Sequence, residues 1–175
     1  MSSSSATASS ESTLIVQKTV YPILFSIAFA HLLNDLLQAV IPASYPILKE
    51  NFNLTFTQIG LITLAYQLAA SILQPVVGLY TDKKPKPFSQ IFGMLFTLSG
   101  IVLLSYASNF SMIILSVVLV GIGSSIFHPE ASRISFLASG GKRGLAQSIF
   151  QLGGNAGTAI GPLLVALIVV PNTQY

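Results

Sequence analysis

The stretch Gly78-Leu-Tyr-Thr-Asp82-Lys83-Lys84-Pro85-Lys86-Pro87 is a short charged segment between two long apolar runs. It holds three of the eight basic residues of a chain in which only 7% of the residues are charged. Such a cluster needs water, and positive clusters beside membrane spans are retained on the cytoplasmic side. The segment therefore predicts how the rest of the chain is threaded through a membrane.

The composition is that of an integral membrane protein. Hydrophobic residues occupy 52% of the 175 positions and the mean hydropathy is +0.75, so polar side chains are too few to cover a soluble globule. Because each span needs about 20 apolar residues, the chain has room for roughly five or six helices and for no separate soluble domain. The absence of cysteine excludes disulfides, thiolate catalysis and cysteine-bound metal ions.

Apolar runs predict an all-α membrane protein with about five transmembrane helices. The runs cover residues 22–41, 57–80, 88–106, 112–137 and 144–170. Residues 1–20 are predicted to form a disordered cytoplasmic tail, and residues 21–175 a partial transmembrane bundle. An odd number of spans is unusual for a fold built from paired helices, so the chain is expected to lack a C-terminal portion.

The distribution of basic residues predicts the orientation of these helices. With residues 83–86 in the cytoplasm, seven of the eight basic residues lie inside and only Lys49 lies outside. The other four inside are Lys18, Arg133, Lys142 and Arg143. We therefore expect a multi-pass protein of the inner or plasma membrane with a cytoplasmic N-terminus. This threading explains the pI of about 9.3 without a nucleic-acid partner.

The first span carries four polar residues on one helical face. At positions i, i+3, i+4 and i+7 stand His31, Asn34, Asp35 and Gln38. An ionised carboxylate at mid-membrane costs about 2.5 to 3.5 kcal/mol, so Asp35 should face a bundle interior, a water-filled cavity or a partner. One interpretation is a proton or substrate site in which His31 shares the proton of Asp35. The other is a structural cluster of hydrogen bonds that fixes helix packing.

The second span carries a stripe of uncharged polar residues that includes Gln67. Side chains at this spacing mark either close helix packing or the wall of a cavity, and Gln67 fits both. Pro75 removes a backbone donor, so we expect a kink there. The connection before this span, residues 45–56, is expected to be an outside loop that ends at an Asn or Thr helix cap.

The fourth span ends in His128-Pro129-Glu130-Ala-Ser-Arg133, the densest group of ionisable residues in the chain. Its spacing is not that of a metal site. If the helix continues through Pro129, Glu130 and Arg133 share one face. Two interpretations stay open: a gated charge pair near the cytoplasmic half of a cavity, or an ion pair that neutralises two residues at the helix end.

The fifth span has two distinct faces. Polar side chains that are candidates for substrate contact or gating occupy one face: Gln147, Gln151 and Asn155. Small residues at successive i+4 steps occupy the other: Gly153, Gly157 and Gly161, with Pro162 directly after the last of them but on the polar face. The glycine spacing allows a neighbouring helix to approach to backbone distance, and the proline adds a kinked or flexible point.

Several stretches resemble known transporters. The run Gly157-Thr-Ala-Ile-Gly161-Pro162 resembles the fifth-span antiporter motif of major facilitator drug exporters. The stretch at residues 78–86 resembles their cytoplasmic loop motif, and its matching residues are Gly78, Asp82, Lys83 and Lys86. Four further stretches are similar to the fosmidomycin-resistance family of that superfamily: His31-Leu-Leu-Asn34-Asp35, Gln74-Pro-Val-Val-Gly78, Phe127-His-Pro-Glu130-Ala-Ser-Arg133, and residues 138–141 with residues 151–155.

The resemblance implies a major-facilitator-type bundle of about twelve spans in two halves, with the substrate site between them at mid-membrane. The chain would supply about five helices of an incomplete N-terminal six-helix half, truncated and inactive alone. The implied function is proton-coupled export of a small antibiotic such as fosmidomycin, or of a related metabolite, without a cofactor. The implied partners are the lipid bilayer, the small-molecule substrate, protons and the missing C-terminal half.

The resemblance also implies residue roles. Asp35 with His31 would be the proton-sensitive pair, and Asp82 with Lys83 would belong to a cytoplasmic gate. Candidate substrate or gating residues are Gln38, Gln67, His128, Glu130, Arg133, Gln147, Gln151 and Asn155.

Two positions depart from the superfamily pattern. Pro85 stands where the loop motif usually has glycine, so a rigid turn replaces a flexible one. Val117 stands where an arginine of the fourth span is expected, just ahead of Gly121. Any proton-relay role of that arginine would have to fall to Glu130, Arg133 or Asp35.

Two other functions compete with transport. A membrane-embedded acyltransferase could use His31 and Asp35 as a base and an acid, but the chain offers no cofactor motif, no cysteine and no nucleophile tied to the pair. A non-transporting membrane scaffold is the third alternative. Drug-dependent growth separates the three, because only an exporter lowers internal drug without consuming it.

Overall fold

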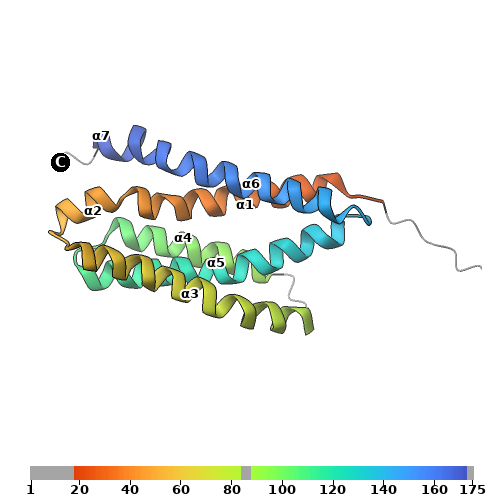
Figure 1. Cartoon of the computed structure of the whole chain (residues 1–175), viewed down its shortest axis with the longest axis horizontal. Coiled ribbons are helices and arrows are strands. Elements are labelled where there is room, and N and C mark those ends of the chain that lie inside the picture. The colour runs from red at the N-terminus through yellow and green to blue at the C-terminus, as the bar shows by residue number, and fades with distance from the viewer. Residues whose placement is uncertain (1–17, 84–87, 173–175) are drawn as a thin grey trace, which may run out of the picture.

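The computed structural model describes residues 18–83 and 88–172, which form helices and short connections without a strand (Figure 1). The elements in chain order are α1 (Tyr21–Ala43), α2 (Tyr45–Asn51), α3 (Phe56–Lys83), α4 (Ser89–Ser105), α5 (Phe110–Ala138), α6 (Arg143–Leu164), the π-helix η1 (Val165–Val169) and α7 (Val170–Asn172). Residues 1–17 of the tail predicted at residues 1–20 lie outside the described residues, and so do the loop positions 84–87, which include Pro85 and Lys86.

The predicted membrane bundle is confirmed. Each of the five apolar runs is a helix, and the last one continues from α6 through η1 and α7. In the described part of the chain, four helices are long and apolar enough to cross a membrane: α1, α3, α5 and the continuous helix Arg143–Asn172. The fifth, α4, has 17 residues. At about 1.5 Å per residue it spans about 25 Å, somewhat less than a typical hydrocarbon core of about 30 Å.

Two connections differ from the sequence-based expectation. The outside loop predicted at residues 45–56 contains the helix α2, which begins with a proline in its first turn, where a missing N–H is tolerated. The expected cap of the next helix is Thr55, whose Oγ1 accepts from the Gln58 N–H at 3.2 Å, while the Gln58 Oε1 accepts from the Thr55 N–H at 2.9 Å. The charged turn at residues 78–83 is also helical, because α3 continues to Lys83.

Two helices continue through internal prolines. α3 is unbroken across Pro75, and α5 is unbroken across Pro129. The continuity of α5 settles one open point, because His128 and Glu130 then project from different sides of one helix. At the other end of α5, the Asn109 side chain accepts from the Met112 N–H at 3.0 Å and caps the helix.

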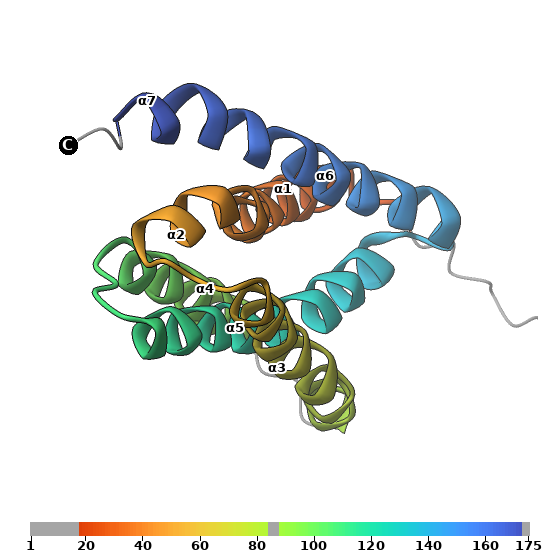
Figure 2. The same cartoon turned by 60° about the vertical axis from the view of Figure 1, so that its left-hand side comes forward.

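The helices pack as two groups that meet at α5. α1 packs along α6, and α5 packs along both α3 and α4 (Figure 2). The glycine ridge of α6 faces α1, as its spacing predicts: a Cβ at Gly157 would lie 2.9 Å from the Leu36 backbone nitrogen, and one at Gly161 2.6 Å from the Ala39 Cβ. The neighbouring helix is therefore α1 of the same chain, and the two backbones are in contact.

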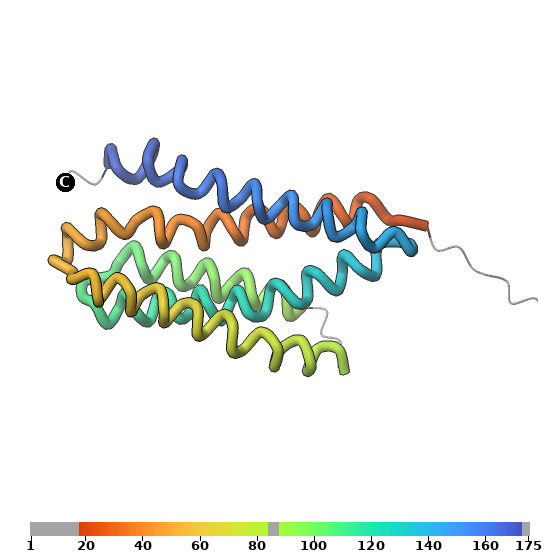
Figure 3. The backbone as a smooth tube through the Cα atoms, in the orientation of Figure 1, coloured from red at the N-terminus to blue at the C-terminus, as the bar shows by residue number. Residues whose placement is uncertain are grey.

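The start of α1, the end of α5 and the start of α6 lie at the same end of the bundle (Figure 3). The Val20 N–H donates to the Ala138 carbonyl at 2.9 Å, and the Thr19 hydroxyl donates to the Ser139 carbonyl at 2.9 Å. The start of α1 therefore lies at the end of α5. The α1–α2–α3 connection, which carries Lys49, lies at the opposite end of the bundle.

The orientation in the membrane stays a prediction, and cysteine labelling checks it. Single cysteines replace Asn51 and Ser108 at one end of the bundle and Gly144 at the other, all three exposed. Because basic residues are retained in the cytoplasm, an impermeant thiol reagent should label intact cells at the first two positions only. Labelling at Gly144→Cys alone would reverse the threading.

Candidate functional site

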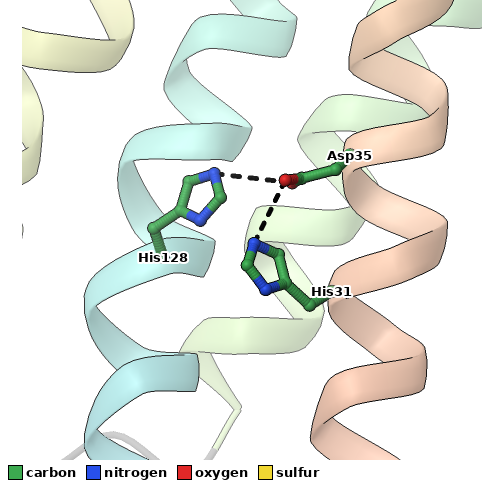
Figure 4. Close-up of side chains that lie close together, drawn as sticks. All are labelled: His31, Asp35 and His128. Carbon is green, nitrogen blue, oxygen red and sulfur yellow. Dashed lines mark ion pairs between the residues drawn. The ribbon is translucent and has the colours of Figure 1, made fainter. Parts of the chain in front are cut away.

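Three ionisable side chains from two helices meet inside the bundle (Figure 4). His31 Nε2 lies 3.1 Å from Asp35 Oδ2, and both residues belong to α1. His128 Nε2, from α5, lies 3.7 Å from Asp35 Oδ1. The i, i+4 spacing predicts the first pair. The sequence places His128 in a separate group on the fourth span, and the fold brings it to the same carboxylate.

His31 is held in one orientation by α6. The residue is 3% exposed, and its ring stacks on Phe150 with the ring centroids 3.9 Å apart. Its Nδ1 lies 2.9 Å from the Phe150 carbonyl oxygen. A carbonyl only accepts hydrogen bonds, so Nδ1 carries a hydrogen and Nε2 is the nitrogen that faces Asp35.

This arrangement limits where a hydrogen can lie in the His31–Asp35 contact. With Nδ1 protonated, a hydrogen lies between Nε2 and Oδ2 only if the imidazole is charged or the carboxyl is protonated. In either case the pair holds one proton more than neutral His31 beside ionised Asp35. Without that proton, two lone pairs would face each other at 3.1 Å. A contact of this length therefore fits a pair that shares one proton.

Asp35 has a further neutral partner that links it to α4. The Asn34 Nδ2 donates to Asp35 Oδ1 at 3.2 Å, and the Thr97 hydroxyl donates to Asn34 Oδ1 at 3.2 Å. Asn34 and Thr97 are both buried. Their hydrogen bonds fix the carboxylate relative to two helices, as the structural interpretation of this face expects.

Gln38 continues the polar face of α1 toward α3 and α5. Its Oε1 accepts from the Tyr66 hydroxyl at 2.5 Å and from the Ser124 hydroxyl at 3.3 Å. Its Nε2 is buried and has no hydrogen-bond partner in the described part of the chain. Sequence reasoning did not single out Tyr66 or Ser124. Only the tertiary contacts between α1, α3 and α5 identify them.

A cavity of about 270 Å³ opens beside this polar face. Its walls come from α1, α2, α3 and α6, and its polar lining consists of Asp35, Gln38, Tyr45, Thr63, Tyr66, Gln67 and Thr158. Gln67 therefore lies on a wall of this cavity. Asp35 is the ionisable acid of this lining, and its side chain is 18% exposed.

Gly154 is a site residue that sequence reasoning missed. A Cβ at this position would lie 2.6 Å from His31 Nε2 and 2.8 Å from Asp35 Oδ2. Glycine is therefore required for α6 to approach the pair. The i+4 series of glycines begins at Gly153, so a second contact one residue further on has no separate signal in the sequence.

The ionisable residues at the end of α5 do not pair as expected. Glu130 is 3% exposed, and its Oε1 is buried without a partner among the described residues. Arg133 instead points to Asp82 of α3, with Nε 3.9 Å from Oδ1. The interpretation as a Glu130–Arg133 ion pair is therefore wrong, because Glu130 is turned into the bundle and Arg133 toward its edge.

The remaining candidates do not join the cluster. Gln147, Gln151 and Asn155 are exposed on α6, and the Gln147 Oε1 accepts from the Ser132 hydroxyl at 3.5 Å. Val117, at the position of the expected arginine, is fully buried in the apolar core. Gly78 faces Pro129 across α3 and α5, and a Cβ added at Gly78 would lie 3.7 Å from the proline Cβ.

The sequence matches a known family over most of its length. The profile of the Major Facilitator Superfamily matches residues 27–174. The fosmidomycin resistance protein of Escherichia coli (strain K12) is 58% identical over 154 residues, which are 88% of this chain and 38% of that protein. The uncharacterized MFS-type transporter YfnC of Bacillus subtilis (strain 168) is 52% identical over 157 residues, which are 90% of this chain and 38% of that protein.

A more distant relative carries a different substrate in its name. The putative glucose/galactose transporter of Helicobacter pylori (strain J99 / ATCC 700824) is 26% identical over 153 residues, 86% of this chain and 36% of that protein. The chain thus spans about two fifths of the length of these curated relatives. No solved structure matches the chain.

Proposed function

The chain belongs to the major facilitator superfamily, and on that premise we propose that it forms part of a transporter that exports a small molecule in exchange for protons. The observation that carries the proposal is the His31–Asp35–His128 cluster beside a polar cavity. Relatives of this chain are named as transporters, not as enzymes, and the acyltransferase alternative is set aside.

The cluster supports coupling to protons. An ionisable group inside a membrane bundle is retained at a cost of about 2.5 to 3.5 kcal/mol on insertion scales, so its presence calls for a role. The His31–Asp35 contact could hold one exchangeable proton, and Asp35 also lines the cavity in which a solute would bind. A proton on this pair and a solute in the cavity would therefore affect each other directly, which is what exchange requires.

The substrate is proposed from the relative with the highest identity described above. Its name links it to resistance to fosmidomycin. We propose that this chain takes part in the export of fosmidomycin or of a related small polar metabolite. The hydroxyl, amide and carboxyl groups of the cavity wall stand among apolar residues, and they would hold the polar groups of such a solute.

Two further parts of the bundle fit a transporter. Arg133 and Asp82 join α5 to α3 at the end of the bundle that we predict to be cytoplasmic, so their contact is proposed as part of a gate with Lys83. The exposed amides of Gln147, Gln151 and Asn155 would be costly against lipid. We propose that these amides face the solute path or a C-terminal half. We propose the same for the open side of the cavity.

A chimera tests the proposed function. Residues 27–174 replace the matching part of the Escherichia coli fosmidomycin resistance protein, and the chimera is expressed in cells that lack an exporter for the drug. We expect higher drug tolerance and a lower internal drug concentration, with the drug itself chemically unchanged. Unchanged internal drug, with the chimera present in the membrane at the level of the intact relative, would favour the scaffold alternative.

A further inference from the structure

We propose that His31, Asp35 and His128 also form a binding site for a divalent transition-metal ion such as Zn²⁺ or Co²⁺. Among the described residues, these three offer one ligand atom each, and all three atoms lie within 4.8 Å of one another. Two imidazole nitrogens and one carboxylate oxygen are a common ligand set for zinc when a further position stays open. This inference goes beyond the proposed function, because the site would bind the ion whether or not a solute moves.

The distances fit a shared ion. In a tetrahedral zinc site with bonds of about 2.0–2.1 Å, neighbouring ligand atoms stand about 3.4 Å apart. The two contacts to the Asp35 carboxylate measure 3.1 Å from His31 to Oδ2 and 3.7 Å from His128 to Oδ1, and one ligand atom from each of the three residues lies within 4.8 Å of the others. An ion shared by the three groups would draw their ligand atoms closer together, to about 3.4 Å.

An independent feature is the orientation of His31. Histidines that bind metal ions usually donate the other ring N–H to a backbone carbonyl or a carboxylate, which fixes the tautomer and the direction of the lone pair. His31 has this arrangement: Nδ1 donates to the Phe150 carbonyl at 2.9 Å, and Nε2 points at the cluster. The carboxylate is fixed in the same way, because Asn34 donates to Asp35 Oδ1.

The open side of the site faces the cavity. His31 is buried, whereas the side chains of Asp35 and His128 are 18% and 25% exposed. Asp35 belongs to the cavity lining, so water or an oxygen atom of a solute would complete the coordination. One carboxylate neutralises only half of a divalent charge, which favours an anionic oxygen at that position.

The binding of Zn²⁺ and Co²⁺ to the purified chain tests the site. The chain is prepared in detergent without a histidine tag and titrated with Zn²⁺ by calorimetry and with Co²⁺ by visible absorption. We expect one ion per chain and a ligand-field spectrum of low coordination number. Replacing His128 with Ala removes a partly exposed ligand and should weaken Zn²⁺ binding at least about tenfold. Asp35→Asn should do the same, with helicity unchanged by circular dichroism.

Glu50→Gln is the matched control, because it removes an exposed carboxylate on α2, 15 residues after Asp35 and outside the cluster, and should leave binding unchanged. Two outcomes overturn the site. One is no uptake of either ion by the unsubstituted chain. The other is uptake that survives both His128→Ala and Asp35→Asn, which would place the ion elsewhere. Neither readout depends on transport, so the proposed function can fail while the metal site holds.

Discussion

Replacing Asp35 with Asn should reduce proton-driven export by the chimera to the level of cells without it, while the protein still inserts into the membrane. The substituted amide keeps the size of the carboxyl group and donates to His31 Nε2, which faces it while Nδ1 is held by Phe150. The contact therefore persists, but the exchangeable proton is gone. Drug accumulation at a fixed proton gradient measures the loss.

A second carboxylate-to-amide substitution controls for this change. Glu50 is exposed on α2, so Glu50→Gln alters the net charge equally but leaves the cluster intact. Its export should match that of the unsubstituted chimera. Normal proton-driven export by Asp35→Asn would show instead that the polar face of α1 is a structural cluster of hydrogen bonds.

Replacing Gly157 with Ala should strongly destabilise the packing of α1 on α6. The added Cβ would lie 2.9 Å from the Leu36 nitrogen and 3.0 Å from the Leu32 carbonyl carbon. Both atoms are backbone, so the helices must separate. We expect a loss of about 2 to 3 kcal/mol, at the upper end of overpacking effects. Unfolding of the chain in increasing concentrations of dodecyl sulfate measures it.

The same substitution at Gly144 is the matched control. Gly144 lies in the first turn of α6, and a Cβ there meets nothing within 4 Å. Alanine is a better helix former than glycine by about 1 kcal/mol, so Gly144→Ala should leave stability unchanged or raise it. If Gly144→Ala and Gly157→Ala behave alike, the close approach of α1 and α6 is not what the structure describes.

Much of the fold could be predicted from the sequence, because membrane spans are set by long apolar runs. The five runs end within a few residues of the observed helices, and the i+4 glycines of α6 predict a close helix contact, which the structure shows to be with α1. The sequence does not reveal α2, because its seven residues are too few for a periodic pattern and begin beside a proline. The sequence does not reveal the end of α3 either, because charged residues after an apolar run are equally typical of a last helical turn and of a loop.

The candidate site was predictable within one helix and not between helices. His31 and Asp35 share a face by spacing alone, and Gln38 extends it. In the sequence His128 stands close to Glu130 and Arg133, which suggests one group. In the fold, however, His128 contacts Asp35 of α1, whereas Arg133 contacts Asp82 of α3. Other site residues act through contacts made between helices, and their residue types carry no signal of that role: Tyr66, Ser124 and Gly154.

The proposed exchange of solute for protons can be measured in sealed vesicles. The purified chimera is placed in vesicles loaded with fosmidomycin and a pH-sensitive dye, with equal pH on both sides. If solute and protons move in opposite directions, the vesicle interior becomes more acidic as the drug leaves, and Asp35→Asn vesicles show no such change. Drug efflux through the unsubstituted chimera with a constant internal pH would contradict the exchange.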